Sequence, residues 1–225
     1  MISILCTKWG KKYNSDYVNI LYSMIRKNYE DEFNFYCYTE YANGLDKEIK
    51  VIPIDDDLEI WWNKIKFFKW EELGQCLSFD LDLIIHNNIS PFIKEKFHMI
   101  KCFWKDDKKI GKDYFIDPYQ STDMRDIQNN SSIMSWKNRK DIWEKFIKNK
   151  EKILDTYITD DRWMHWQNIE YDTYQKGLCY SYMQGSDFYS DNEPKKYRPD
   201  YHVCIFNQDP KPDKLSDPWI KEYWK

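Results

Sequence analysis

Short apolar runs alternate with a stretch of helical spacing over the first fifty residues, and this alternation constrains the fold most. The apolar runs lie at residues 2–7, 33–39 and 50–54, and the helical stretch lies at 17–29. Within that stretch Val18, Leu21 and Ile25 mark one face of a helix. Strands that alternate with helices in this way are typical of a parallel α/β sheet. We therefore predict an α/β fold with a mixed, mostly parallel sheet flanked by helices.

The rest of the chain continues the pattern without a repeat or a low-complexity linker. We predict helices at 61–73, 139–154, 160–169 and 217–224, and strands at 76–87, 99–104, 131–136 and 202–207. Asp160 or Asp161 is placed to cap the third of these helices, and Pro218 to begin the last. We expect a single domain spanning residues 1–225.

Charge and cysteine content exclude several classes of function. The formal net charge of −4 gives no attraction to nucleic acid or to an anionic membrane. No segment approaches the roughly 18 continuous apolar residues of a membrane span. Six cysteines are scattered without a C-x-x-C spacing, which favours buried reduced thiols. Residues 1–10 lack the charged start of a signal peptide, so we expect a cytoplasmic protein.

Two aspartates interrupt the most apolar run of the chain, residues 76–87. Asp80 and Asp82 would point to the same side of a strand, and Leu81 to the other. Because an unpaired buried carboxylate costs several kcal/mol, either a cation meets these side chains or the strand ends there at water. At the carboxyl edge of a sheet the pair could hold a hard divalent cation and, through it, phosphates. A solvated strand end is the alternative.

Five motifs in one order give this pair a context. They are "CTKWG" at 6–10, "WWNKIKFF" at 61–68, the Asp-x-Asp at 80–82, "NNSSIMSW" at 129–136 and "FNQDPKP" at 206–212. This order resembles that of small bacterial and viral glycosyltransferases with the GT-A fold, over almost the whole chain. The resemblance implies a single GT-A domain, which is Rossmann-like, and a nucleotide-sugar donor.

The resemblance also implies roles for particular residues. A divalent cation, Mn²⁺ or Mg²⁺, would be held by Asp80, Asp82 and Asn207. The donor nucleotide and sugar would contact Thr7, Lys8, Trp9, Gly10, Tyr13, Tyr17, Thr39, Lys64, Asp80, Leu81, Asn130, Ser131, Ser132 and Lys211. A catalytic carboxylate would come from "TDDRW" at 159–163, where Asp161 is favoured and Asp160 competes with it.

Alternatives stay open for several of these side chains. Tyr13 and Tyr17 could stack on a base or pack on the helix, and Lys64 could neutralise phosphate or face solvent. The chain departs from the family pattern at Glu40, where the family has Asp, and at Asn207, where it has His. We expect Asn207 to take the ligand position, with Asp209 as the alternative if the loop bends, and to bind the metal more weakly than a His would.

The function that these residues imply is transfer of a sugar to a hydroxyl acceptor. The donor would be a uridine diphosphate sugar, and the metal would offset charge on the departing diphosphate. The acceptor pocket would be built from loops such as 105–126 and 185–200. Two rivals remain: a non-catalytic nucleotide- or sugar-binding protein on the same fold, and a nucleotidyltransferase.

Overall fold

A computed structural model describes residues 1–55, 57–102, 129–187 and 193–225. The expected acceptor loop at 105–126 lies outside these residues. The other expected acceptor loop, 185–200, is described except at 188–192.

The main sheet has seven strands in the described part of the chain, in the order β3-β2-β1-β4-β7-β6-β8. Their bounds are Ile2–Lys8 for β1, Phe33–Thr39 for β2, Lys50–Pro53 for β3, Gln75–Phe79 for β4, His98–Lys101 for β6, Asn129–Lys137 for β7 and Asp172–Thr173 for β8. The first four in space run parallel, whereas β7 is antiparallel to both of its neighbours. The predicted mixed, mostly parallel sheet is confirmed.

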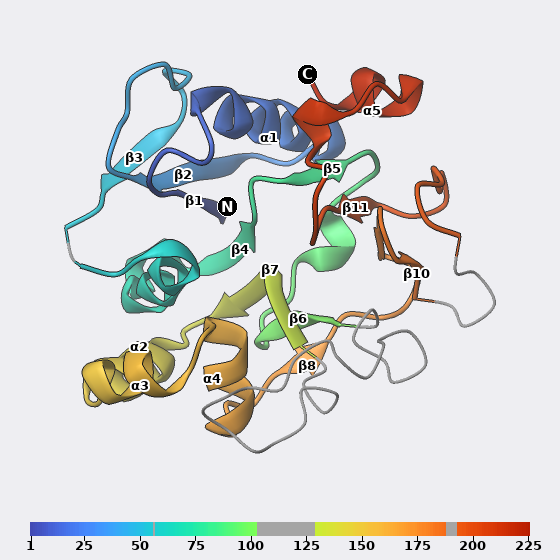
Figure 1. The fold of residues 1–225 in the computed structure, drawn as a ribbon. Helices are drawn as coiled ribbons and strands as arrows, with labels where there is room; N and C mark the ends of the chain where they lie inside the picture. Colours follow the sequence, from blue (N-terminus) through green and yellow to red (C-terminus); the bar gives the residue numbers. More distant parts are fainter. Residues whose placement is uncertain (56, 103–128, 188–192) are drawn as a thin grey trace.

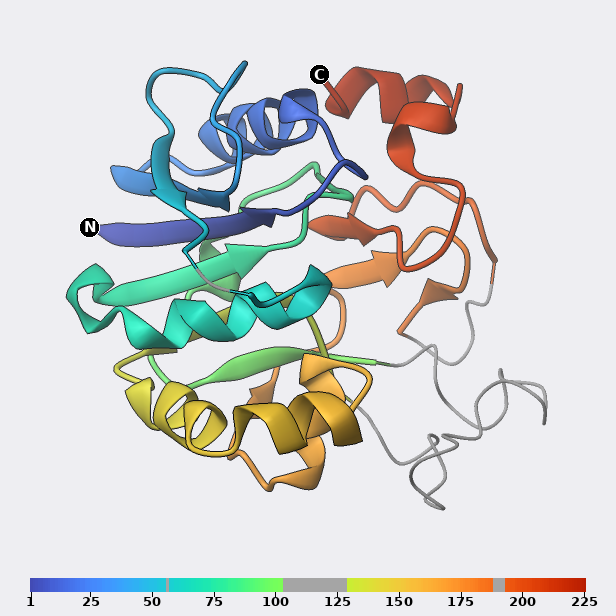
Figure 2. The ribbon, with the colours of Figure 1, turned by 60° about the vertical axis from the view of Figure 1, so that its left-hand side comes forward.

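Helical segments cover both faces of this sheet (Figures 1 and 2). The helices α1 (Ser15–Asn28) and α5 (Pro218–Tyr223) lie on one side. On the other side lie the 3-10 helix η1 (Ile60–Lys69) and the helices α2 (Lys140–Ile147), α3 (Lys150–Thr156) and α4 (Asp160–Trp166). Short 3-10 turns complete the chain at η2 (Glu71–Leu73), η3 (Ser90–Phe92) and η6 (Pro212–Lys214).

Alternate residues of β1 feed two separate hydrophobic cores. Ile4 and Cys6 face α1 in one core, whereas Leu5 faces η1 and α2 in the other. This division follows from the period of two in a strand, which sends successive side chains to opposite faces of the sheet. Because both faces of β1 are buried, apolar side chains occupy the successive positions Ile4, Leu5 and Cys6 instead of alternate ones.

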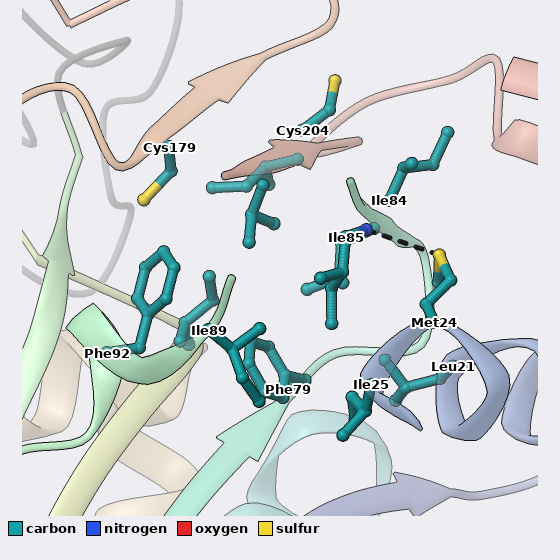
Figure 3. Packing of buried hydrophobic residues seen from close by; sticks show 14 of the residues in the cluster. Leu21, Met24, Ile25, Phe79, Ile84, Ile85, Ile89, Phe92, Cys179 and Cys204 are labelled. Carbon is teal, nitrogen blue, oxygen red and sulfur yellow. Dashed lines mark hydrogen bonds between the residues drawn. The ribbon is translucent and has the colours of Figure 1, made fainter. Parts of the chain in front are cut away.

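A second, smaller sheet continues the α1 side of the molecule. Its order is β10-β9-β11-β5, with bounds Leu83–Ile85 for β5, Cys179–Ser181 for β9, Gly185–Ser186 for β10 and Val203–Ile205 for β11. Figure 3 shows Ile84 and Ile85 of β5 beside Met24 of α1. The backbone N–H of Ile85 donates to Met24 Sδ at 3.4 Å.

The run at 76–87 is not the single strand that we expected. It divides into β4 and β5, which belong to different sheets, and Asp80, Leu81 and Asp82 connect them. The backbone N–H of Asp80 still donates to Ser132 O at 2.8 Å, so the pairing of β4 with β7 extends by one residue. Leu83 then pairs with Ile205 of β11. The aspartates therefore lie where the chain changes sheets.

Three of the helix expectations are also wrong in detail. The helix expected at 61–73 is instead the two 3-10 helices η1 and η2, which are separated at Trp70. The helix expected at 139–154 is two helices, because Asn149 between them has a non-helical backbone with φ −136° and ψ 29°. The N-cap of α4 is Thr159, whose Oγ1 accepts from the backbone N–H of Arg162 at 3.4 Å, so neither Asp160 nor Asp161 is the cap. Pro218 begins the last helix as expected.

The six cysteines are all buried and free, as the sequence indicated. Among the described residues, the helices are too short and too polar to cross a membrane.

Candidate active site

Six separate segments meet at the carboxyl ends of β1 and β4. Phe79, the last residue of β4, pairs with Ile133 of the antiparallel β7. The first residues of β7 therefore lie beside the connection that holds Asp80 and Asp82. η1, the loop after β1, the start of α4 and the loop after β11 bring further polar side chains to this edge of the sheet.

Asp80 is paired with a lysine that is anchored on three sides. Lys64 Nζ lies 2.6 Å from Asp80 Oδ1, and it donates to Ser131 Oγ at 3.0 Å and to Ser131 O at 3.3 Å. Burial alone would lower the pKa of Lys64, but the charges of Asp80 and Asp160 outweigh it and raise that pKa. Lys64 is therefore a nearly buried cation, and it does not face solvent.

Asp82 is paired with a second lysine. Lys211 Nζ lies 2.8 Å from Asp82 Oδ2, and it also donates to Phe206 O at 2.7 Å. The same carboxylate oxygen accepts from Tyr13 OH at 2.7 Å. Burial raises the pKa of Tyr13, and the charge of Asp82 raises it further, so this phenol stays protonated. One carboxylate thus joins the loop after β1 to the loop after β11.

Asp160 and Asp161 differ sharply in their surroundings. Asp160 Oδ1 accepts from Ser131 Oγ at 3.1 Å, whereas Asp160 Oδ2 is buried without a hydrogen-bond partner in the described part of the chain. Burial raises the pKa of Asp160 to about 7, against the pull of Lys64. The carboxylate of Asp161 is engaged, because Oδ1 accepts from the side chain of Thr159 and from the backbone N–H of Arg162.

The end of β1 has two polar groups that make no hydrogen bond or ion pair to another described residue. Thr7 Oγ1 is buried and has no hydrogen-bond partner among the described residues. Lys8 is only 6% exposed, and its Nζ lies 5.6 Å from the centre of the Tyr41 ring, with no ion pair to any described residue. Thr39, at the end of β2, accepts from the backbone N–H of Tyr41 at 3.2 Å.

The loop that follows β1 begins with Trp9 and Gly10. Trp9 is partly exposed at this edge. Gly10 has a φ of +64°, a conformation that favours glycine, and its backbone N–H donates to Glu40 Oε2 at 2.7 Å. Glu40, the departure from the family pattern, therefore holds the loop at Gly10.

Other expected residues contribute less than their positions implied. Tyr17 is 8% exposed, donates to Asp213 Oδ1 at 2.5 Å and contacts the ring of Trp224, so it packs and does not offer a face to a base. The side chain of Leu81 is buried in the core, so only its backbone can meet a donor.

The start of β7 brings three further expected residues to the site. Ser131 contacts Lys64 and Asp160, as described above. Asn130 Nδ2 donates to Asp161 Oδ2 at 3.5 Å, and Asn130 Oδ1 accepts from the backbone N–H of Ser132 at 3.0 Å.

Asn207 lies two residues beyond the end of β11, and its Oδ1 accepts from Ser181 Oγ at 2.6 Å. Two residues of this region were not expected from the sequence: Ser181, and Asn129, whose Nδ2 donates to Asp161 O at 3.1 Å. The "NNSS" run could have pointed to Asn129. For Ser181 we find no sequence signal.

The chemistry of the donor atoms suits a hard divalent cation. Asp80 and Asp82 each keep one carboxylate oxygen that makes no hydrogen bond to a described residue, and Asn207 adds an amide oxygen. In the described residues no three side chains among His, Cys, Asp and Glu are gathered as a ready metal site. Both aspartates are instead paired with ammonium groups, so a metal would have to share them.

Solved glycosyltransferases share this fold. The galactosyltransferase LgtC, solved with donor and acceptor sugar analogues, is 12% identical over 94% of this chain and 89% of that chain, with a TM-score of 0.61. GlyE of Streptococcus pneumoniae is 11% identical over 100% of this chain and 60% of that chain, with a TM-score of 0.62. WbbM, a bifunctional glycosyltransferase, is 10% identical over 94% of this chain and 46% of that chain, with a TM-score of 0.57.

No family model matches the chain, and no curated protein matches its sequence. The likeness to the solved structures therefore concerns the fold. It confirms the expected fold class: the protein has the GT-A fold.

Proposed function

We propose that this protein is a metal-dependent glycosyltransferase that moves a hexose from a nucleotide-sugar donor to a hydroxyl acceptor. One observation carries the proposal. On a GT-A fold, the connection between β4 and β5 brings Asp80 and Asp82 together with two lysines and the buried Asp160. This is the edge of an α/β sheet where ligands bind.

The donor diphosphate would lie between the two lysines. Asp80, Asp82 and the amide oxygen of Asn207 would hold Mn²⁺ or Mg²⁺, which supplies positive charge to the departing nucleoside diphosphate. Lys211 would grip a phosphate oxygen by a charge-assisted contact. Lys64 would keep the buried end of the site neutral.

The nucleoside would lie at the end of β1. Thr7 and Lys8 offer a hydroxyl and an ammonium group without polar partners among the described residues, and such groups favour a polar ligand there. A uridine diphosphate sugar is the donor that we propose. Its ring would meet the loop at Gly10, which Glu40 holds in place.

Asp160 is the carboxylate best placed to meet the donor sugar. Its Oδ2 is buried without a partner in the described residues, so a sugar hydroxyl could satisfy it, whereas Asp161 already accepts hydrogen bonds from Thr159 and Arg162. With its pKa raised to about 7, Asp160 also gains and loses its proton near neutral pH, which suits a general acid or base. We therefore rank Asp160 above Asp161 for the sugar contact.

A nucleotide- or sugar-binding protein without catalysis is the second candidate. The observation that favours it is that both aspartates carry lysine partners while Asn207 Oδ1 accepts from Ser181. The six free thiols support a reducing, cytoplasmic location for either candidate.

Release of the nucleoside diphosphate from nucleotide sugars tests the proposal. We expect release from a uridine diphosphate hexose with Mn²⁺, and thermal stabilisation of the protein by uridine diphosphate plus Mn²⁺. Asp80→Asn and Asp82→Asn should fold and lose both responses. Asp141→Asn is the matched control, because Asp141 is exposed and pairs with Arg139 away from the site.

Three results would decide against the proposal. Stabilisation by nucleotides with no release from any donor and acceptor mixture would favour the binding protein. An unchanged Mn²⁺ response in both aspartate variants would remove the aspartates from the site. A response to nucleoside triphosphates but not to nucleotide sugars would favour the nucleotidyltransferase.

A further inference from the structure

The loop after β11 places a positive charge on a predicted metal ligand. Lys211 Nζ lies 2.8 Å from Asp82 Oδ2, and the two side chains are only 14% and 16% exposed. Shielding from water strengthens such a pair relative to a surface salt bridge. Asp82 therefore has a counter-ion from within the protein itself.

The partners of the two lysines differ in a way that matters for function. Lys64 donates to Ser131 Oγ and to Ser131 O as well as to Asp80, and the charge of the buried Asp160 also stabilises its ammonium form. Lys211 has only Asp82 and the carbonyl of Phe206 as hydrogen-bond partners among the described residues. An ammonium group has three donors on a flexible stem, so Lys211 can change partners more easily than Lys64.

We infer that Lys211 is an exchangeable counter-ion of Asp82. The lysine hinders binding of a divalent cation at Asp82 until a donor diphosphate binds, and it then moves to the diphosphate. The inference rests on the proposed function for the identity of the diphosphate. It does not depend on turnover.

Charge explains the exchange. A divalent cation at Asp82 would lie close to the Lys211 ammonium, and like charges at short range oppose each other. A diphosphate offers Lys211 several anionic oxygens, so the ammonium can leave the carboxylate without losing a partner. Asp82 is then free for the metal, which also binds the diphosphate.

The consequence is positive coupling between metal and diphosphate. Each ligand should tighten the binding of the other by the same factor, since coupling free energies are reciprocal. Couplings of this kind are typically about 5- to 150-fold. The metal would thus be retained mainly when a donor is present.

The test is a calorimetric titration of the protein with Mn²⁺ alone. Lys211→Met removes the competing charge and should tighten Mn²⁺ binding about tenfold, which corresponds to about 1.4 kcal/mol. The same variant should bind uridine diphosphate more weakly than the wild type does. With the diphosphate present, its Mn²⁺ affinity should rise less than that of the wild type.

Three further variants separate charge from other effects. Lys214→Met removes a charge from the same segment, where Lys214 is 73% exposed and pairs with Asp213, and it should leave Mn²⁺ affinity unchanged. Tyr13→Phe frees the same oxygen of Asp82 from a neutral donor, and it should tighten Mn²⁺ much less than Lys211→Met. Lys211→Arg keeps the charge and should keep Mn²⁺ binding weak.

An Mn²⁺ affinity of Lys211→Met equal to or weaker than that of the wild type would overturn the inference, as would equal tightening by Tyr13→Phe. The Lys211→Arg variant tests the role of charge even if Lys211→Met misfolds. Tighter Mn²⁺ binding by Lys211→Arg, which keeps the charge, would also contradict the inference. If the wild type binds no nucleoside diphosphate, the proposed function fails. The titrations with Mn²⁺ alone still report on the counter-ion.

Discussion

Asp80 and Asp82 lie in an apolar stretch because each has an ammonium partner. The Lys64 Nζ–Asp80 Oδ1 distance is 2.6 Å, and the Lys211 Nζ–Asp82 Oδ2 distance is 2.8 Å. Such pairs offset the desolvation cost of a carboxylate without adding much net stability, so their presence points to a role other than folding. If this edge of the sheet served only to pack, apolar residues would stabilise the fold at least as well as these ion pairs do.

His86 is another polar residue in apolar surroundings, and it has no counter-ion among the residues described. Its ring lies 5.2 to 5.8 Å from the rings of Tyr180, Tyr197 and Tyr223, and both ring nitrogens are buried without hydrogen-bond partners. Burial and, to a smaller extent, the charge of the nearby His202 together lower the pKa of His86 from 6.5 to about 4. His86 is therefore neutral in the folded protein at neutral pH.

This environment predicts a loss of stability in acid. Between about pH 6.5 and pH 4, His86 is protonated in the unfolded chain and mostly neutral in the folded protein. The free energy of unfolding therefore falls as pH falls. The loss should approach about 3 kcal/mol by pH 4 and grow no further below it. Denaturant melts of wild type and His86→Phe across this range measure the effect.

In His86→Phe the His86 share of this pH dependence should vanish. His98→Phe is the matched control, since His98 lies outside the cage of three tyrosines. Parallel pH curves for wild type and His86→Phe would show that His86 does not titrate as described.

At the scale of elements, the loop after β1 is shaped by one glycine and one glutamate. Gly10 has a φ of +64°, no atom lies within 4 Å of where its Cβ would be, and its N–H donates to Glu40. Gly10→Ala should therefore cost about 1–2 kcal/mol of unfolding free energy through backbone strain alone. Because this loop borders the proposed nucleoside site, Gly10→Ala should also weaken the binding of uridine diphosphate.

Gly74 provides a matched comparison. It has a φ of +68° and equally open surroundings, but it lies before β4, at the opposite end of that strand from the site. Gly74→Ala should lose similar stability and keep its nucleotide affinity, as measured by chemical denaturation and calorimetry. Equal losses of affinity in both variants would mean that Gly10 acts only through stability.

At the scale of the whole molecule, two cores share one sheet. Ile84 lies in the core on the α1 side, and Phe146 lies in the core on the α2 side; both are fully buried. Because β1 and β4 contribute to both cores, we expect them to unfold together in one transition. Each of Ile84→Ala and Phe146→Ala should lower the free energy of unfolding by about 2–5 kcal/mol.

The measurement is denaturant unfolding followed both by tryptophan fluorescence and by circular dichroism. The two signals should coincide in the wild type and in both variants. Ile147→Ala is the control beside Phe146, because Ile147 is 48% exposed and should change stability by about 0.5 kcal/mol or less. Separate transitions for the two signals would show that the cores unfold independently.

The sequence by itself determined the class of fold, because period and length carry that information locally. Local periodicity is enough to recognise four elements without any distant contact: the strands β1, β2 and β4 and the helix α1. It also determined that Asp80 and Asp82 needed either a cationic partner or water, since an unpaired buried carboxylate is costly in any fold.

Only the tertiary structure decided which cations those are and where the strand ends. Lys211 and Asp82 are far apart in sequence, and no local pattern links them. The division of residues 76–87 depends on Ser132 and Ile205, which offer hydrogen bonds in two different sheets. Asp160 and Asp161 are neighbours of one residue type, yet burial left Asp160 Oδ2 without a partner while Thr159 and Arg162 engaged Asp161. The burial of Asp160 beside Ser131 and the pairing of Lys211 with Asp82 arise from contacts between segments that are remote in the sequence, so a local pattern does not contain them.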